Sequence, residues 1–216
     1  MARNIAPSIL SADFGHLERD IRMVNESAAG WIHLDIMDGT FVPNISFGLP
    51  VSAAIAKVAA KPMDANLMIV HPEKYVERFA ALGIQYISVH IEACEDLSAT
   101  LALIRGAGAK AGIAINPETD EALLKPYLKE ADYILVMSVH PGFSGQSFIE
   151  GSVEKVARVR EMIAEAGADC LIEVDGGVGM KNIAALEAAG ASVFVAGNAA
   201  FKAADPRAAI AELAGI

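Results

Sequence analysis

Eight short apolar runs alternate with eight amphipathic stretches along this chain, and this alternation most limits the folds that it can adopt. The runs are rich in isoleucine, valine and leucine with little polar alternation, which is typical of parallel strands covered on both faces. They predict strands at residues 5–10, 31–37, 63–69, 86–91, 110–116, 133–139, 170–175 and 193–197. The stretches between them predict helices at residues 13–27, 50–60, 73–81, 97–107, 119–129, 152–166, 181–188 and 206–213.

Eight strand–helix repeats predict the α/β class and a single-domain (β/α)8 TIM barrel over residues 1–216. The chain is 54% hydrophobic, which is ample for one well-buried core, and no Pro/Ser-rich linker divides it. The alternative is a doubly wound sheet. Its usual G-x-G-x-x-G fingerprint after the first strand is absent, because residues 9–12 read ILSA.

Composition limits the partners of the chain. Its 17 basic and 27 acidic residues give a net charge of −10, which disfavours nucleic acid and anionic membranes. No apolar run is long enough to span a bilayer, and the N-terminal residues lack a signal-peptide core. Cys94 and Cys170 stand in no metal or redox spacing and fit small buried residues in a reducing compartment. We therefore expect a cytoplasmic protein that binds neither nucleic acid nor membranes.

Polar side chains gather where the predicted strands end, in the motifs HLDIMDG and EVDGG. Side chains alternate along a strand, so His33 and Asp35 share one face of the second strand, and Glu173 and Asp175 share one face of the seventh. With Asn66 of the third strand, they would converge in a barrel mouth. Taken singly, a histidine fits a core position and an aspartate fits a helix cap. Taken together, they favour a functional site, and imidazole with carboxylate suits Zn²⁺, Mn²⁺ or Fe²⁺ better than Ca²⁺.

Glycines follow the last three predicted strands, in the segments HPGFSGQ, GG and GN. Glycine lets backbone N–H groups approach an anion closely, and barrels often hold a phosphate between the loops after strands seven and eight. Main-chain binding would explain how an acidic protein holds a phosphate without a lysine cluster. The alternative interpretation is that these glycines only form tight turns.

Two further groups of side chains are placed near the mouth. His90 ends the fourth predicted strand, and a substrate contact suits it better than a metal bond. Met37, Met68 and Met137 occupy equivalent depths, where they fit core packing or an apolar floor beneath a charge-delocalised intermediate.

The ordered motifs resemble the ribulose-phosphate 3-epimerase family nearly from end to end. They read APSILSAD, HLDIMDG with FVPN, NLM, VMSV with PGF, GQ, and EVDGG. The resemblance implies a (β/α)8 barrel, a divalent metal ion, a phosphorylated ketose substrate and a homo-oligomer.

The resemblance also implies roles for individual residues. Asp35 and Asp175 would be the acid/base pair. The metal ligands would be His33, Asp35 and Asp175, with Asn66 where the family usually has a fourth ligand, a histidine. The implied substrate and phosphate contacts are Ser8, Gly142, Phe143, Ser144, Gly145, Gly176, Gly177, Gly197 and Asn198.

This chain departs from the family pattern at four positions. An amide oxygen at Asn66 binds zinc less well than imidazole, so metal affinity and identity are open. The family usually has asparagine at His140, glycine at Ser144 and serine at Asn198. These three changes leave the exact sugar open.

The expected reaction inverts C3 of D-ribulose 5-phosphate to give D-xylulose 5-phosphate through an enediolate. One alternative is a 3-epimerase of another ketose phosphate, such as D-allulose 6-phosphate. A second is a phosphate-binding barrel with impaired metal binding. A third is an aldol-type synthase or isomerase with a lysine base, which is disfavoured because Lys110 begins its strand and no lysine stands at a strand tip.

Overall fold

Eight parallel strands form one sheet that curls into a barrel in the computed structural model, which describes residues 2–216. The strands are β1 (Asn4–Pro7), β2 (Ile32–Met37), β3 (Met63–Met68), β4 (Tyr86–His90), β5 (Lys110–Ile115), β6 (Tyr133–Met137), β7 (Leu171–Asp175) and β8 (Val193–Ala196). Each strand from β2 to β7 pairs with its successor, β8 pairs with β1, and a parallel bridge between Ser8 and His33 closes the ring.

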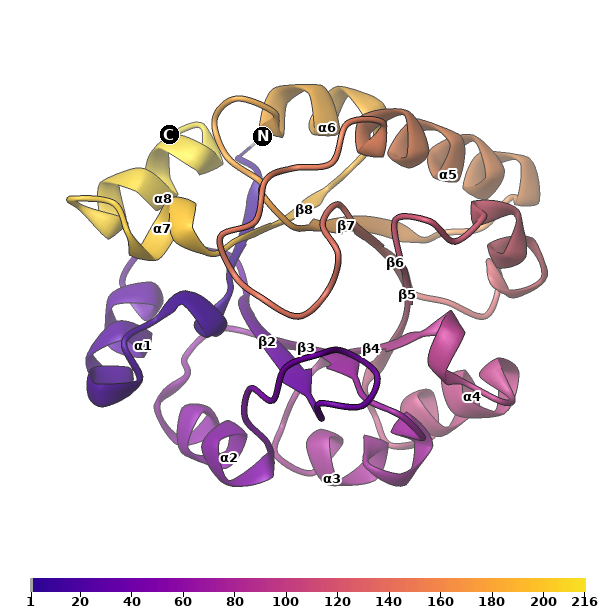
Figure 1. Cartoon of the computed structure of the whole chain (residues 1–216), viewed down its shortest axis with the longest axis horizontal. Helices are drawn as coiled ribbons and strands as arrows, with labels where there is room; N and C mark the ends of the chain where they lie inside the picture. Colours follow the sequence, from indigo (N-terminus) through magenta and orange to yellow (C-terminus); the bar gives the residue numbers. More distant parts are fainter. Residues whose placement is uncertain (1) are drawn as a thin grey trace.

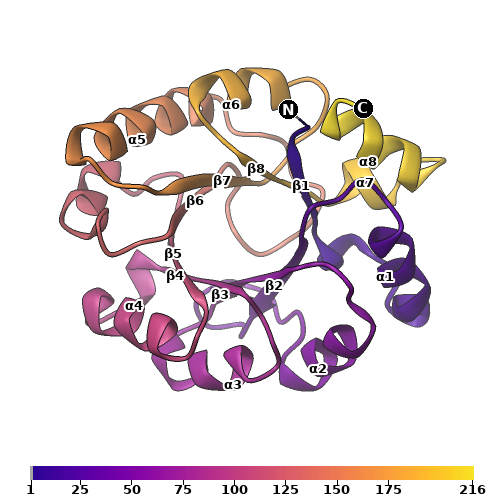
Figure 2. The same ribbon diagram turned by 180° about the vertical axis from the view of Figure 1, so that it is seen from behind.

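Helices surround the ring of strands in both views (Figures 1 and 2). The α-helices are α1 (Leu17–Asn25), α2 (Leu49–Val58), α3 (Val76–Ala80), α4 (Leu97–Gly106), α5 (Ser152–Ala166), α6 (Ile183–Ala189), α7 (Asn198–Phe201) and α8 (Pro206–Ala214). The 3-10 helices are η1 (Ile9–Ser11), η2 (Phe14–His16), η3 (Pro72–Lys74), η4 (Ile91–Ala93) and η5 (Glu121–Tyr127). The predicted (β/α)8 TIM barrel is confirmed. Within residues 2–216, no helix combines the length and apolar character needed to cross a membrane.

The elements predicted from the sequence differ from the structure at several places. The first strand stops at Pro7, because the chain turns into η1 and the Ser8 side chain accepts a hydrogen bond from the amide of Leu10. The segment predicted as a helix at 119–129 forms the 3-10 helix η5, which contains Pro126, a residue with no N–H to donate. The short α7 after β8 was not predicted, since four residues carry no readable helical period.

Alternation along each strand gives the barrel two different packing faces. In β2, Ile32 and Leu34 point outward and belong to the large apolar core between sheet and helices. His33 and Asp35 point inward, and all six residues of β2 are buried. Because helices cover the outer face and the barrel interior covers the other, the polar side chains of β2 are buried along with its apolar ones.

Aromatic side chains fill the interior near the amino ends of the strands. Trp31 stacks on Tyr86 with ring centroids 3.9 Å apart, and Tyr86 meets the edge of Tyr133 at 6.0 Å. Tyr133 reaches inward across β5 because residue 112 is glycine. A Cβ at Gly112 would lie 2.2 Å from the Tyr133 ring. This end of the barrel is therefore plugged, and the polar side chains lie above the plug toward the other end.

The contact between Gly112 and Tyr133 generates a stability prediction. We expect Gly112→Ala to lower the free energy of unfolding by about 1–3 kcal/mol, because the new methyl group overlaps the fully buried Tyr133 ring. Urea denaturation would measure this. Gly106→Ala is the matched control, since a Cβ there meets no atom within 4 Å. Equal stabilities for the two variants would contradict the proposed packing.

Candidate active site

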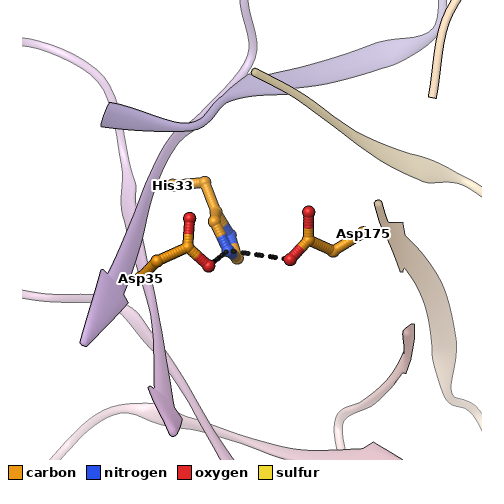
Figure 3. A group of neighbouring side chains, drawn as sticks. All are labelled: His33, Asp35 and Asp175. Atoms are coloured by element: carbon orange, nitrogen blue, oxygen red, sulfur yellow. Dashed lines mark hydrogen bonds and ion pairs between the residues drawn. The ribbon is translucent and has the colours of Figure 1, made fainter. Parts of the chain in front are cut away.

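His33 lies at the centre of a cluster of carboxylates inside the barrel. Its Nε2 lies within hydrogen-bond distance of Oδ1 of Asp35, at 3.2 Å, and lies 3.9 Å from Oδ2 of Asp175. Figure 3 shows the two aspartates facing each other with the imidazole between them. One ligand atom from each of the three residues lies within 4.8 Å of the others. Asp35 of β2 and Asp175 of β7 therefore lie close together, although their strands are far apart in sequence.

Asp35 is held in place from the neighbouring strand. It is 4% exposed, and Oγ of Ser8 donates to its Oδ2 at 2.5 Å. Ser8 reaches this position because the end of β1 lies beside β2, where the bridge between Ser8 and His33 closes the ring. Among residues 2–216, the Asp175 side chain has no such hydrogen-bond partner, and it is 15% exposed. The two acids therefore occupy unlike environments.

These environments move the two pKa values apart. Burial raises the pKa of Asp35, but the charge and hydrogen bond of His33 and the Ser8 hydrogen bond outweigh it, so the net pKa is lowered. Burial, and then repulsion from Asp35, raises the pKa of Asp175 to about 7. Burial opposes protonation of His33, but the charges of Asp35 and Asp64 raise its pKa well above the usual value. Near neutral pH the site thus holds one ionised acid beside one that readily keeps a proton.

Asn66 is the cross-strand neighbour of Asp35 in the register of β2 and β3. Its Nδ2 donates to Sδ of Met137 at 3.7 Å, and its buried Oδ1 has no hydrogen-bond partner in residues 2–216. The imidazole of His33 and the carboxylates of Asp35 and Asp175 form a donor set that suits a divalent cation. The residues present therefore fit the metal ion that the sequence predicts.

A second buried layer lies beneath His33. Nδ1 of His33 donates to Oδ2 of Asp64 at 2.5 Å, and the hydroxyl of Tyr133 donates to Oδ1 of Asp64 at 3.1 Å. Glu173 lies 3.6 Å from the same Nδ1, and burial, then the charge of Asp64, raises the pKa of Glu173 well above its usual value. Neither Asp64 nor Tyr133 was among the predicted site residues. The period of two from Asn66 would have found Asp64, because the two share one face of β3.

A cavity of about 750 Å³ opens above the cluster at the carboxyl ends of the strands. Asp35, Asp175 and the three methionines of β2, β3 and β6 line it. All nine residues predicted to contact substrate or phosphate line it too: Ser8, Gly142, Phe143, Ser144, Gly145, Gly176, Gly177, Gly197 and Asn198. The connection between β6 and α5 passes over this end of the barrel (Figure 1). The structure therefore gathers every predicted site residue at or directly beneath one cavity.

The glycines of this cavity are required by close packing. Gly177 has φ of 61°, and a Cβ there would lie 2.6 Å from the backbone nitrogen of Phe148. Gly197 precedes α7 as its N-cap, so the first amides of that helix stand beside the cavity. Both the turn and the anion-binding interpretations of these glycines are compatible with this geometry.

Hydrogen bonds that the sequence analysis did not assign stabilise the loops. Nδ2 of Asn44 donates to the carbonyl of Gly142 at 2.7 Å and joins the β2–α2 connection to the β6–α5 connection. Nε2 of Gln146 donates to the carbonyls of His140 and Phe143 at 2.6 and 3.0 Å. The motifs FVPN and GQ contained both donors, but only the folded loops show their partners.

Two histidines lie apart from the cavity. His90 is fully buried, with Nδ1 3.3 Å from Oε2 of Glu92 and its ring 4.8 Å from that of Phe41. It is not among the residues that line the cavity, and its substrate contact stays a prediction. His140 is exposed and pairs with Glu118 at 3.1 Å.

An eight-stranded parallel barrel with ionisable side chains and glycine-rich loops at the carboxyl ends of its strands has the layout of (β/α)8-barrel enzymes. Solved barrels share the fold along the whole chain. KGPDC from Streptococcus mutans has a TM-score of 0.72 at 12% identity, covering 99% of this chain and 96% of that one. A 3-hexulose-6-phosphate synthase has a TM-score of 0.69 at 21% identity, covering 100% and 99%. At these identities the likeness concerns the fold alone.

Closer relatives identify the family. The model of the ribulose-phosphate 3 epimerase family matches residues 4–201. The ribulose-phosphate 3-epimerase of Synechocystis sp. is 49% identical over 215 residues, covering 98% of this chain and 94% of that protein. The Bacillus subtilis enzyme of the same name is 43% identical over 212 residues, covering 98% of both. The chain therefore belongs to the ribulose-phosphate 3-epimerase family, a family of isomerases that act on a phosphorylated sugar.

The raised pKa of Asp175 predicts a pH-dependent stability difference. Folded Asp175 holds its proton up to about pH 7, against an ordinary value of 3.8. Its contribution to stability is therefore present below pH 4 and is lost as the pH rises to about 7. Asp175→Asn stays neutral, so the variant should gain stability relative to the parent across this range. Urea denaturation of chelator-treated proteins from pH 4 to 8 measures the difference, and pH-independent differences would contradict it.

Proposed function

We propose that this protein inverts C3 of D-ribulose 5-phosphate to give D-xylulose 5-phosphate by acid/base catalysis between Asp35 and Asp175. The observation that carries the proposal is the opposition of these two carboxyl groups across His33 at the floor of the cavity. Inversion next to a ketone requires removal of a proton from one face and delivery to the other. Two acids on opposite strands can serve both faces of one small molecule.

The unlike pKa values support a division of roles. The ionised Asp35 takes the C3 proton, and the protonated Asp175 delivers a proton to the opposite face of the enediolate. In the reverse reaction the two acids exchange roles, as a reversible epimerisation requires. Ser8, which donates to Asp35, keeps that carboxylate oriented. The methionines at the same depth support an apolar floor beneath the delocalised charge.

His33, Asp35, Asp175 and Asn66 would hold a divalent cation. Such an ion supplies positive charge that offsets the negative charge developing on the oxygens of the reacting carbons. The unpartnered Oδ1 of Asn66 supports its inclusion. Zn²⁺, Mn²⁺ and Fe²⁺ all suit this mixture of donors.

Main-chain amides around Gly145, Gly177 and Gly197 would bind the phosphate, with Asn198 beside them. Backbone amides can bind a phosphate without lysine side chains, in keeping with the acidic composition. The alternative substrate, D-allulose 6-phosphate, is not favoured, since the curated relatives are named for ribulose phosphate. Assembly as a homo-oligomer in the cytoplasm also belongs to this proposal and rests on the family resemblance.

Coupled assays with several pentulose and hexulose phosphates test the proposed substrate. We expect the highest kcat/KM for D-ribulose 5-phosphate, with turnover that depends on added Mn²⁺, Zn²⁺ or Fe²⁺ after chelation. A preference for a hexulose phosphate would overturn the substrate assignment. Full activity in chelator without metal would overturn the cation assignment.

We expect Asp175→Asn to reduce turnover by about 10²–10⁴-fold or more, because the amide can neither take nor deliver the proton. Binding of the phosphorylated ligand, measured by calorimetry, should persist. Asp169→Asn makes the same change before the amino end of β7, away from the cavity, and should retain full activity. Normal turnover by Asp175→Asn would refute the two-acid scheme.

The role of Asn66 has a separate test. We expect Asn66→His to tighten Zn²⁺ binding, because imidazole is a better zinc donor than an amide oxygen. Mn²⁺, which accepts oxygen donors readily, should gain less. Calorimetry of the chelator-treated variant with each ion provides the comparison. Unchanged affinity for both ions would remove Asn66 from the ligand set.

A further inference from the structure

The two ring nitrogens of His33 have different neighbours. Nε2 faces Asp35 and Asp175, at 3.2 and 3.9 Å, on the side of the cavity. Nδ1 faces Asp64 at 2.5 Å, on the side of the barrel floor. An imidazole that binds a cation through one nitrogen carries its proton on the other. The partner of Nδ1 therefore decides whether Nε2 is free to bind.

Asp64 lies next to His33 but is not exposed in the cavity. It is fully buried and is not among the residues that line the cavity. Both of its oxygens are used: Oδ2 accepts from His33, and Oδ1 accepts from the hydroxyl of Tyr133 at 3.1 Å. Two donors from different strands thus fix the position of one carboxylate.

Tyr133 is itself confined. It is fully buried, its ring lies against Gly112, and its edge contact with Tyr86 is 6.0 Å between centroids. A rigid ring presents its hydroxyl at one place. This series of contacts therefore involves four strands. It runs from Gly112 of β5 to Tyr133 of β6, then to Asp64 of β3 and His33 of β2.

We propose that Asp64, held by Tyr133, is a positioning residue that fixes the proton of His33 on Nδ1 and aims Nε2 at the cation site. This inference deepens the proposed function and rests on the cation site proposed there. A carboxylate that accepts from the far nitrogen of a histidine ligand orients the ring and makes it a stronger donor.

Glu173 offers a matched control for Asp64. Both are fully buried carboxyl groups beneath His33, and Oε1 of Glu173 lies 3.6 Å from the same Nδ1. Neither oxygen of Glu173 has a hydrogen-bond partner within the described part of the chain. Glu173→Gln therefore changes the same chemical group at the same depth without removing a hydrogen bond to His33.

The test measures Mn²⁺ binding to chelator-treated proteins by electron paramagnetic resonance of the free ion. We expect Asp64→Asn to weaken binding by about 10–100-fold, because an amide can donate to Nδ1 and so favour the wrong tautomer. Tyr133→Phe should weaken it less, and Glu173→Gln should match the parent. The visible spectrum of bound Co²⁺ should change in Asp64→Asn, which loss of stability alone would not produce.

Each outcome separates the inference from the function on which it rests. Parental Mn²⁺ affinity in Asp64→Asn, or an equal loss in Glu173→Gln, overturns the positioning role and leaves the cation site standing. Absence of Mn²⁺ binding by the parent overturns the cation site and the positioning role together. If Asp64→Asn does not fold, Tyr133→Phe decides, and unchanged affinity in that variant overturns the inference.

Discussion

The pairing of buried charges around His33 is the interaction on which the rest of this site depends. Taking an ionised group out of water costs several kcal/mol, and close partners must offset that cost. Here one imidazole lies between Asp64 on the floor side and Asp35 and Asp175 on the cavity side. Because the charges share this partner, the protonation of each depends on the others. The same arrangement that makes burial tolerable also gives the two opposed acids different pKa values.

The barrel makes this arrangement rigid. The inward side chains come from strands whose outward side chains are locked in the apolar core with the helices. Below the charges, Trp31, Tyr86 and Tyr133 form a packed plug, and Asp35 and Asp175 line the cavity on the other side. Above them, a hydrogen bond from Asn44 to the carbonyl of Gly142 joins the loops to one another. The cavity therefore has two parts. The buried acids at its floor are suited to proton transfer, and the glycine-rich loops at its opening are suited to binding an anion.

Much of the fold could be predicted from the sequence because strands buried on both faces have a clear composition. β2 and β7 were placed within one residue at each end, and α5 over its full length. The failures have local causes. Pro126 converts a helical pattern into the 3-10 helix η5, and η1 interrupts the first strand because the Ser8 side chain caps the turn. In the site, the alternation of HLDIMDG correctly put His33 and Asp35 on one inward face.

By itself, the sequence determined the eight repeats, the inward face of each strand and the glycines of the rim, because these follow from spacing along the chain. Only the tertiary structure decided which inward side chains meet. Asp64 is the direct cross-strand partner of His33 in the register of β2 and β3, so pairing of these neighbouring strands places it there. Closure of the ring brings Tyr133 of β6 to Asp64 and Asp175 of β7 opposite Asp35, across strands that do not pair with each other. No local pattern encodes those distances, since they are set by the closure of the whole ring.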